Sequence, residues 1–201
     1  GQAMNAPLLN TRVPDHPVAE IFPARWSPRA FSEAVMTEDE VLLLLEAARW
    51  APSASNVQPW RFAWGLRGDA GFAAIAGALV PFNRAWAEKA SALIVVASRR
   101  VRNGSDGVVD NPWHGFDAGT AWGYLAMQAQ MSGFHAHAMG GFDHAVAAQA
   151  LGLPEDHALH AVVAVGKLGD PARLSESLRA RETPSLRLPL AALAGRGKFP
   201  A

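Results

Sequence analysis

Residues 93–97, Leu-Ile-Val-Val-Ala, form an uninterrupted apolar run that constrains the fold more than any other part of this sequence. An apolar run of strand length indicates a strand near the centre of a sheet. Residues 159–165 are nearly as apolar and 60–64 alternate in polarity, so both also fit strands. A further strand is expected over 134–139. The chain is therefore predicted to contain a small sheet.

A helix is predicted after Thr37, because Thr37 and Glu40 have the spacing of a capping box. Residues 41–50 are apolar on almost every side of a helix, so we expect this helix to be central and buried. Pro52 should end it. Other helices are expected over 70–80, around 84–90, over 117–132 with Asp117 as the cap and Gly133 as the stop, and over 143–151.

The helices and strands alternate irregularly, and few connections are long enough for a regular βαβ series. An α+β domain, with a small sheet covered by helices, fits better than a doubly wound fold. We expect an N-terminal arm, 1–24, with at most one short helix, followed by a single domain, 25–201. Residues 99–116 are polar and read as a loop. The tail from 170 on is rich in Arg and Pro and has no core pattern of its own.

The charge balance excludes several classes of function. Lys and Arg total 18, as do Asp and Glu, so the formal net charge is zero. Nucleic-acid binding and attachment to an acidic membrane surface both need a basic surplus. No apolar run approaches the roughly 18 residues of a membrane span. We therefore expect a protein that acts on a small molecule, with no nucleic-acid or membrane partner.

The chain has no cysteine, which excludes disulfides, thiolate catalysis and cysteine-ligated metals. The absence fits a cytoplasmic protein. His135 and His137 would share one face of a strand, but no carboxylate or cysteine near them has metal-ligand spacing. No metal site is predicted.

The segment Arg25-Trp26-Ser27-Pro28-Arg29 places two guanidiniums and a hydroxyl close together. The fixed fork of donors on arginine suits a phosphate, and Ser27 can add another donor. A solvated turn before a helix is the alternative interpretation. Arg187, in the tail, would on its own be a solvated charge.

In the segment 51–60, Ala-Pro-Ser-Ala-Ser-Asn-Val-Gln-Pro-Trp, two prolines bracket small polar residues between a helix and a strand. Small side chains let the backbone approach a flat ligand, and Asn56 offers a donor and an acceptor to a ring edge. The alternative is an ordinary helix-to-strand loop. Gln58 and the order of the residues favour the binding interpretation.

A third segment, 138–143, carries Gly140 and Gly141 between a strand and a helix. Paired glycines allow close backbone approach, and exposed amides can hold an anion or a ring carbonyl. Strand-to-helix turns also use glycine for purely structural reasons. Trp113 and His114, on the polar stretch, are the best candidates to line a substrate pocket.

Taken in order, these segments and the Arg187-Leu188-Pro189 tail motif resemble the nitroreductase family of FMN enzymes. The family pattern is R-x-S-x-R-x-F, then A-P-S-x-x-N-x-Q-P-W, then a glycine-containing strand end before F-D, then a late R-x-P. The resemblance spans roughly residues 25–190. It implies an α+β sandwich with a mostly antiparallel central sheet flanked by helices, and a homodimer with exchanged C-terminal tails.

The resemblance also implies a set of cofactor-binding residues. Arg25, Ser27 and Arg29 would hold the phosphate and ribityl chain of FMN, with Trp26 beside them and Arg187 joining at the phosphate. Asn83 would lie near the pyrimidine edge of the flavin ring. Two backbone segments would approach the ring. The partner subunit would contribute Pro52, Ser53, Ala54 and Asn56. The same chain would contribute Ala138, Met139, Gly140 and Gly141.

The implied activity is reduction of nitroaromatics, quinones or related electrophiles with NADH or NADPH, in two half-reactions with ping-pong kinetics. The cofactor carries the chemistry, so no side chain is assigned as catalytic. A specialised flavoenzyme of the same superfamily, whether flavin-fragmenting, dehalogenating or dehydrogenating, is an alternative, as is a non-catalytic flavin-binding protein. Two departures bear on the substrate: Gly140 stands where many members have Glu, and the stretch between 97 and 118 is short.

Overall fold

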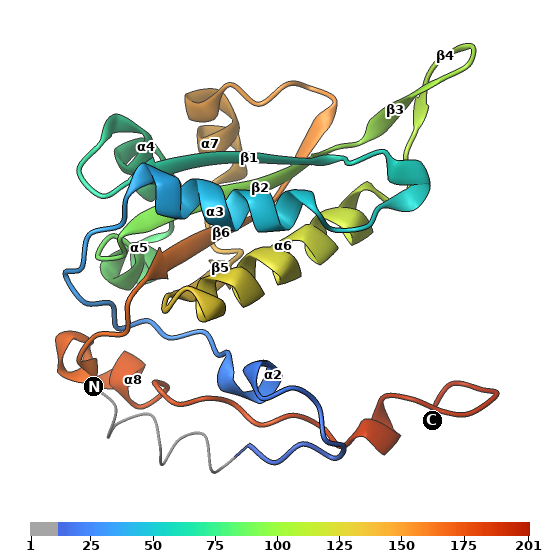
Figure 1. The fold of residues 1–201 in the computed structure, drawn as a ribbon. Coiled ribbons are helices and arrows are strands. Elements are labelled where there is room, and N and C mark those ends of the chain that lie inside the picture. The colour runs from blue at the N-terminus through green and yellow to red at the C-terminus, as the bar shows by residue number, and fades with distance from the viewer. Residues whose placement is uncertain (1–11) are drawn as a thin grey trace.

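The sheet at the centre of the molecule has four antiparallel strands in the order β1-β2-β6-β5. They are β1 (Trp60–Leu66), β2 (Ala92–Arg99), β6 (His157–Gly166) and β5 (His135–Met139). The structure is a computed structural model that describes residues 12–201, and Figure 1 shows its layers. The apolar run 93–97 lies in β2, the most buried strand. The predicted α+β fold is confirmed.

Each face of the sheet is covered by a separate layer of helices (Figure 1). Leu93 and Val95 point to one face and Ile94 and Val96 to the other, as expected for alternate residues of a strand. The first face is covered by α4 (Ala70–Ala78), α5 (Pro81–Ala87) and α7 (His144–Leu151), and the second by α3 (Glu38–Arg49) and α6 (His114–Met131). Burial on both faces explains why β2 is apolar throughout.

The helix α3 begins at the predicted capping box, with reciprocal hydrogen bonds between Thr37 and Glu40. The expectation that it is buried all round is wrong for the single chain. Only Val41, Leu44 and Ala48 are buried, while Leu42 and Leu43 are 43% and 48% exposed. One side of α3 packs on the sheet, and residues 12–201 leave its apolar far side about half exposed.

The polar stretch 99–116 is not a loop, and the prediction there is wrong. It forms a hairpin of β3 (Val101–Gly104) and β4 (Gly107–Asp110), which projects beyond the sheet in Figure 1. Gly107 has a φ of 115°, a conformation that favours glycine, directly after the two-residue turn. The strands lack a buried face, so they lack the apolar alternation that identifies a strand.

The helix α6 begins at His114, three residues before the predicted cap at Asp117. Asp117 lies inside the first turn and is buried, so it does not cap the helix. Its Oδ2 instead accepts the backbone N–H of Ala54 at 3.0 Å. The carboxylate thus connects α6 to the loop after α3.

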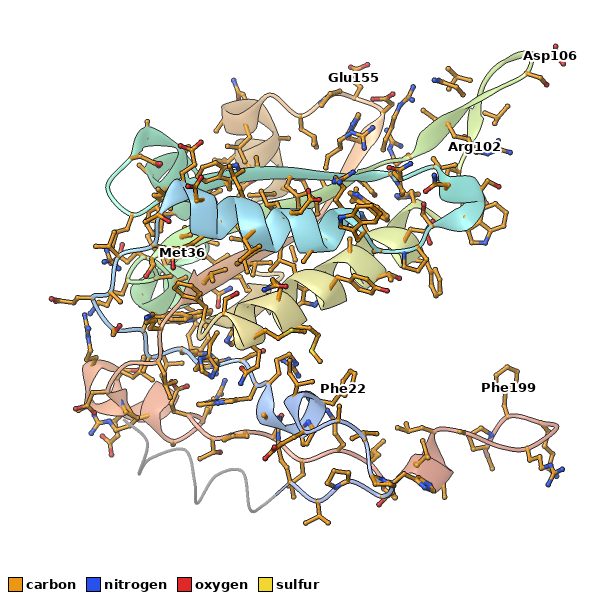
Figure 2. All side chains as sticks on the ribbon, in the orientation of Figure 1. Phe22, Met36, Arg102, Asp106, Glu155 and Phe199 are labelled. Atoms are coloured by element: carbon orange, nitrogen blue, oxygen red, sulfur yellow. The ribbon has the colours of Figure 1, made fainter. Side chains whose placement is uncertain are left out.

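The tail does contribute to the core, contrary to expectation. Leu174 and Leu178 are buried against the α4–α5 face, the second from within the short helix α8 (Glu176–Arg179). Beyond Pro184 the chain is largely exposed and extended, with only the turn η3 (Leu190–Ala192), and Phe199 projects from it in Figure 2. Residues 12–24 of the arm hold one short helix, α2 (Ile21–Ala24), and residues 1–11 lie outside the described part.

Within residues 12–201, no helix is both long and apolar enough to cross a membrane. No group of three or more His, Asp or Glu side chains in the same range is arranged to hold a metal ion.

Candidate functional site

A cavity of about 670 Å³ lies between α6, the end of the arm and β5. Arg25 and Ser27 line it from the first predicted segment, and Ala138 lines it from the third. The rest of its wall comes from α2 and α6: Phe22, Thr120, Trp122, Gly123, Tyr124, Ala126 and Met127. The fold therefore brings together two predicted segments that are more than a hundred residues apart in the chain.

The arginine end of this cavity is strongly positive. Burial lowers the pKa of Arg25, and the charge of nearby Arg187 lowers it further. Burial likewise lowers the pKa of Arg12, with additional effects from Arg187 and Arg25. Three guanidiniums are close enough to repel one another, and none of the three forms an ion pair among the described residues. Such a cluster is suited to binding an anion.

The Arg12 guanidinium donates hydrogen bonds to backbone carbonyls of both the arm and the tail. Its Nε donates to the carbonyl of Ser185 at 2.7 Å, and its Nη1 donates to the carbonyls of Pro23 and Arg25 at 3.0 and 2.8 Å. The arm and the tail are thereby joined beside Arg25. The resemblance did not include Arg12, and no local pattern in the sequence marks it.

Arg29 does not line the same cavity as Arg25. Its guanidinium lies over the Trp86 ring, 5.7 Å from the centroid, and borders a separate hollow of about 60 Å³. Its Nε is buried without a hydrogen-bond partner. Trp26 is buried with its ring edge-on to His135, at 6.2 Å between centroids. The side chains of Arg25 and Arg29 thus border two different cavities.

Glu182 organises the backbone of the first segment and was missed by sequence reasoning. Its carboxylate accepts the N–H of Arg29 at 2.9 and 3.0 Å and the N–H of Ala30 at 2.7 Å. Glu182 is 6% exposed, so these hydrogen bonds stand in for the lost hydration of the carboxylate.

At the end of β5, Asn83 and Gly141 form a close pair. Asn83 Nδ2 donates to the Gly141 carbonyl at 3.0 Å. A Cβ added at Gly141 would lie 2.5 Å from that same nitrogen, so the contact requires glycine. At Gly140, which is exposed, an added Cβ would meet nothing within 4 Å, and Met139 is buried. Gly140 therefore presents open backbone at the strand end.

The loop 52–58 has an unusual backbone. Ser55, Asn56 and Gln58 all have φ between 52° and 55°. Non-glycine residues rarely adopt this region, at a cost of about 1–3 kcal/mol each, and such strain gathers at functional sites. The hydrogen bonds that hold the loop include Gln58 N–H to Ser53 Oγ, Gln58 Nε2 to the Asn56 carbonyl, and Ala54 N–H to Asp117.

The structure does not bring this loop into the 670 Å³ cavity of its own chain. None of Pro52, Ser53, Ala54 or Asn56 lines that cavity in the described residues, and Pro52 and Asn56 are exposed. Arg187 is near Arg25 but borders a different cavity, of about 580 Å³, between the arm and the tail.

Trp113 and His114 stand at the start of α6, near the loop rather than in the cavity. Trp113 is half exposed, and His114 Nδ1 lies 2.7 Å from the buried Ser98 hydroxyl. The same hydroxyl is 2.6 Å from His160 Nε2. His160 occupies the irregularity in the β2–β6 pairing, which places its side chain on the α6 face.

Comparison with known proteins gives a consistent result. The model of the nitroreductase family matches residues 23–70 and 72–167. A 15.4 kDa uncharacterised protein of Mycolicibacterium smegmatis is 36% identical over 148 residues, which are 69% of this chain and 97% of that protein.

Solved structures agree with that match. One, of an oxidoreductase containing FMN, is 42% identical with a TM-score of 0.92, covering 94% of this chain and 96% of its own. A protein of Desulfovibrio desulfuricans in complex with FMN is 25% identical with a TM-score of 0.72, covering 92% and 99%. A nitroreductase family protein from Clostridium difficile 630, at 20% identity and a TM-score of 0.66 over 87% and 95%, shares the fold. This chain belongs to the nitroreductase family.

Proposed function

We propose that the protein is an FMN-dependent oxidoreductase that uses NADH or NADPH to reduce nitroaromatic, quinone or related small electrophiles. The observation that carries the proposal is the 670 Å³ cavity in which Arg25, Ser27 and Ala138 meet. Its volume is within the range of cofactor sites, about 300–1,000 Å³. FMN in the similar structures supports the assignment of the cofactor.

The donor set at the cavity fits FMN. A phosphate would bring negative charge to Arg25 and Arg187, which repel each other. Neither arginine forms an ion pair with a carboxylate among the described residues. Ser27 adds a hydroxyl donor. At the other end, open backbone at Gly140 would let a flat ring approach β5. The chain thus offers a charged end for a phosphate and an uncharged end for a ring.

FMN, when bound, would supply hydride acceptance from the nicotinamide and electron transfer to the second substrate in a ping-pong cycle. The residues of this chain would bind and orient it. Arg25, Ser27 and Arg187 would hold the phosphate end, while Asn83, fixed by the Gly141 carbonyl, would set the orientation of the pyrimidine edge. Arg29 would need to leave Trp86 to reach the ribityl chain. No side chain is assigned as a catalytic acid or base.

The other half of the site would come from a second copy of the chain. The strained loop that carries Pro52, Ser53, Ala54 and Asn56 is exposed and lines no part of its own chain's cavity. Its distorted backbone is held by hydrogen bonds to Asp117 and Ser53 of the same subunit. A homodimer in which this loop covers the partner's flavin, and in which the exposed tail crosses over, accounts for both features.

The proposal is tested on purified protein by its absorbance spectrum and by anaerobic titration with NADH and NADPH. We expect about one FMN per subunit, bleached by at least one of the two donors. Reoxidation by a quinone or a nitroaromatic should restore the oxidised spectrum. A protein that binds no FMN on addition would refute the cofactor assignment, and bound flavin that neither donor bleaches would leave a binding protein without turnover.

A further inference from the structure

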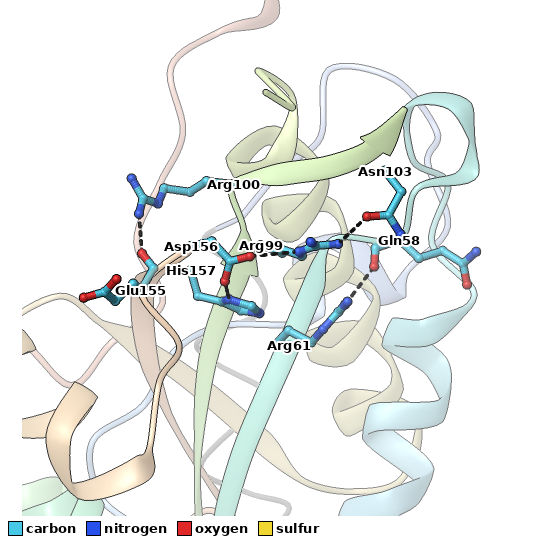
Figure 3. Close-up of polar contacts among 8 residues, drawn as sticks. All are labelled: Gln58, Arg61, Arg99, Arg100, Asn103, Glu155, Asp156 and His157. Carbon is cyan, nitrogen blue, oxygen red and sulfur yellow. Dashed lines mark hydrogen bonds and ion pairs between the residues drawn. The ribbon is translucent and has the colours of Figure 1, made fainter. Parts of the chain in front are cut away.

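A further cavity, of about 290 Å³, lies where the hairpin leaves the sheet and shares no lining residue with the three cavities described above. Its lining comes from β1, β2, β3 and the loop before β1: Val57, Pro59, Arg61, Arg99, Val101, Arg102 and Asn103. Figure 3 shows Arg61 and Arg99 side by side at this position, and Figure 2 shows Arg102 on the hairpin.

Three of the seven lining residues are arginines and none is acidic. One carboxylate reaches the group from outside: Asp156 Oδ2 accepts from Arg99 Nε at 3.1 Å, while its other oxygen is 2.7 Å from His157 Nδ1. A single carboxylate against three guanidiniums leaves about two positive charges without a partner among the described residues.

Two of these arginines are already fixed in place. Arg61 Nη1 donates to the carbonyls of Gln58 and Trp60, at 2.9 and 2.8 Å. Arg99 is fixed by Asp156 and by a longer contact with Asn103 Oδ1, at 3.4 Å (Figure 3). Among residues 12–201, each keeps further N–H donors without a partner, and Arg102 makes no side-chain hydrogen bond. Pre-positioned guanidiniums with free donors bind oxyanions at a low entropic cost.

The excess of two charges selects the ligand. A phosphate monoester carries between one and a half and two negative charges near pH 7, with three acceptor oxygens, roughly matching three guanidiniums. A carboxylate carries only one charge and would leave part of the repulsion in place.

The cavity is continuous with the strained loop. Val57 and Pro59 form part of its wall, and the Gln58 carbonyl that Arg61 holds belongs to a residue with a φ of 55°. A ligand bound by Arg61 would therefore touch the segment that, in the proposed function, covers the flavin.

We propose that Arg61, Arg99 and Arg102 form a binding site for a phosphate monoester. On the proposed function, on which this part rests, the monoester is the 2′-phosphate that distinguishes NADPH from NADH. Free inorganic phosphate is the other source of the same chemistry.

The test is calorimetric titration of flavin-loaded protein with NADP⁺, NAD⁺ and inorganic phosphate, none of which requires turnover. Arg61→Gln and Arg102→Gln are compared with Arg100→Gln. Arg100 neighbours Arg99 in the chain, but its guanidinium donates to the Glu155 carbonyl and does not line the cavity. We expect NADP⁺ to bind at least tenfold more tightly than NAD⁺. Loss of one charge-assisted contact should lower its affinity about ten- to a hundredfold in the two test variants only.

Equal binding of NADP⁺ and NAD⁺, with phosphate binding that both test variants lose, would support the site and assign it to free phosphate. If no phosphate ligand binds, or if binding survives in both test variants, the inference is wrong. The flavin spectrum of each protein is recorded first, because failure to hold FMN contradicts the proposed function alone. The phosphate titration can then still be made on the flavin-free protein.

Discussion

Glu182 Oε2 accepts the backbone N–H of Ala30 at 2.7 Å, across 152 residues of sequence. The same carboxylate accepts the N–H of Arg29, so one buried side chain from the tail fixes two successive amides of the first segment. Arg25 and Ser27 lie a few residues before those amides. The tail therefore shapes the proposed phosphate end of the site within the same chain.

Glu182→Ala should destabilise the protein by about 1.5–3 kcal/mol, because it leaves two amides of the first segment without an acceptor. It should also weaken FMN binding through the displaced backbone. Urea denaturation and FMN titration measure the two effects. Glu155→Ala is the matched control, since the Glu155 side chain is exposed and only its carbonyl takes part in a contact. Equal stability in the two variants would remove this role from Glu182.

Arg25→Gln should lower the affinity for FMN about ten- to a hundredfold, since a charge-assisted contact contributes roughly 1.5–3 kcal/mol. The fold should tolerate the change, because it relieves the repulsion that lowers the pKa of Arg25. Fluorescence quenching on titration with FMN gives the affinity. Arg196→Gln, an exposed tail position, serves as the control. Unchanged affinity in Arg25→Gln would favour the solvated-turn interpretation.

Long-range contacts explain what the sequence did not predict at this site. The strands of the central sheet were predictable because β2 is buried on both faces and is therefore apolar throughout. Glu182 and Asp117 were not, because their partners are backbone amides far away in the chain. Asp117 is of a residue type that often caps helices. Only the packing of the loop against α6 shows that its carboxylate accepts the N–H of Ala54 instead.

The hairpin β3–β4 was likewise not predictable from the sequence. Gly107, with its φ of 115°, follows the two-residue turn of Ser105 and Asp106, but the strands bury no side-chain row. Without a buried face the sequence carries no periodic signal, and the segment resembled a polar loop. Its contribution to the arginine cavity depends on the hairpin leaving the sheet at the end of β2, which no pattern in the sequence indicates.

Stability should fall between about pH 6.5 and pH 4 because of His137. Burial lowers its pKa to about 4, with a smaller lowering by Arg29 and opposing hydrogen bonds to the backbone at Pro28 and Ser27. In this window the unfolded chain binds a proton that the folded chain does not, so the free energy of unfolding decreases as the pH falls. The shift corresponds to about 3 kcal/mol.

Urea denaturation at pH 7 and pH 4.5 measures the loss, and His137→Gln should reduce it. His135, whose pKa is also lowered by burial and by Arg25, will keep part of the dependence in the variant. An identical loss in the wild type and in His137→Gln would show that His137 is not responsible.

The last prediction concerns the exposed apolar face of the α3–α6 layer. In the single chain, α3 leaves Leu42 and Leu43 about half exposed, and α6 leaves Phe116 77% and Met131 66% exposed. Apolar groups gathered on one layer in this way mark an interface. We expect Phe116→Glu to shift the protein towards the monomer, measured by light scattering over a dilution series. Phe116 precedes Asp117, the residue that holds Ala54, so an interface at Phe116 also lies beside the loop proposed to cover the partner's flavin. Loss of the dimer should therefore release FMN in the same concentration range.

Val146→Glu, at a half-exposed position on α7 in the opposite layer, should leave both the mass and the flavin content unchanged. A Phe116→Glu monomer that retains its FMN would show that each subunit holds a complete site.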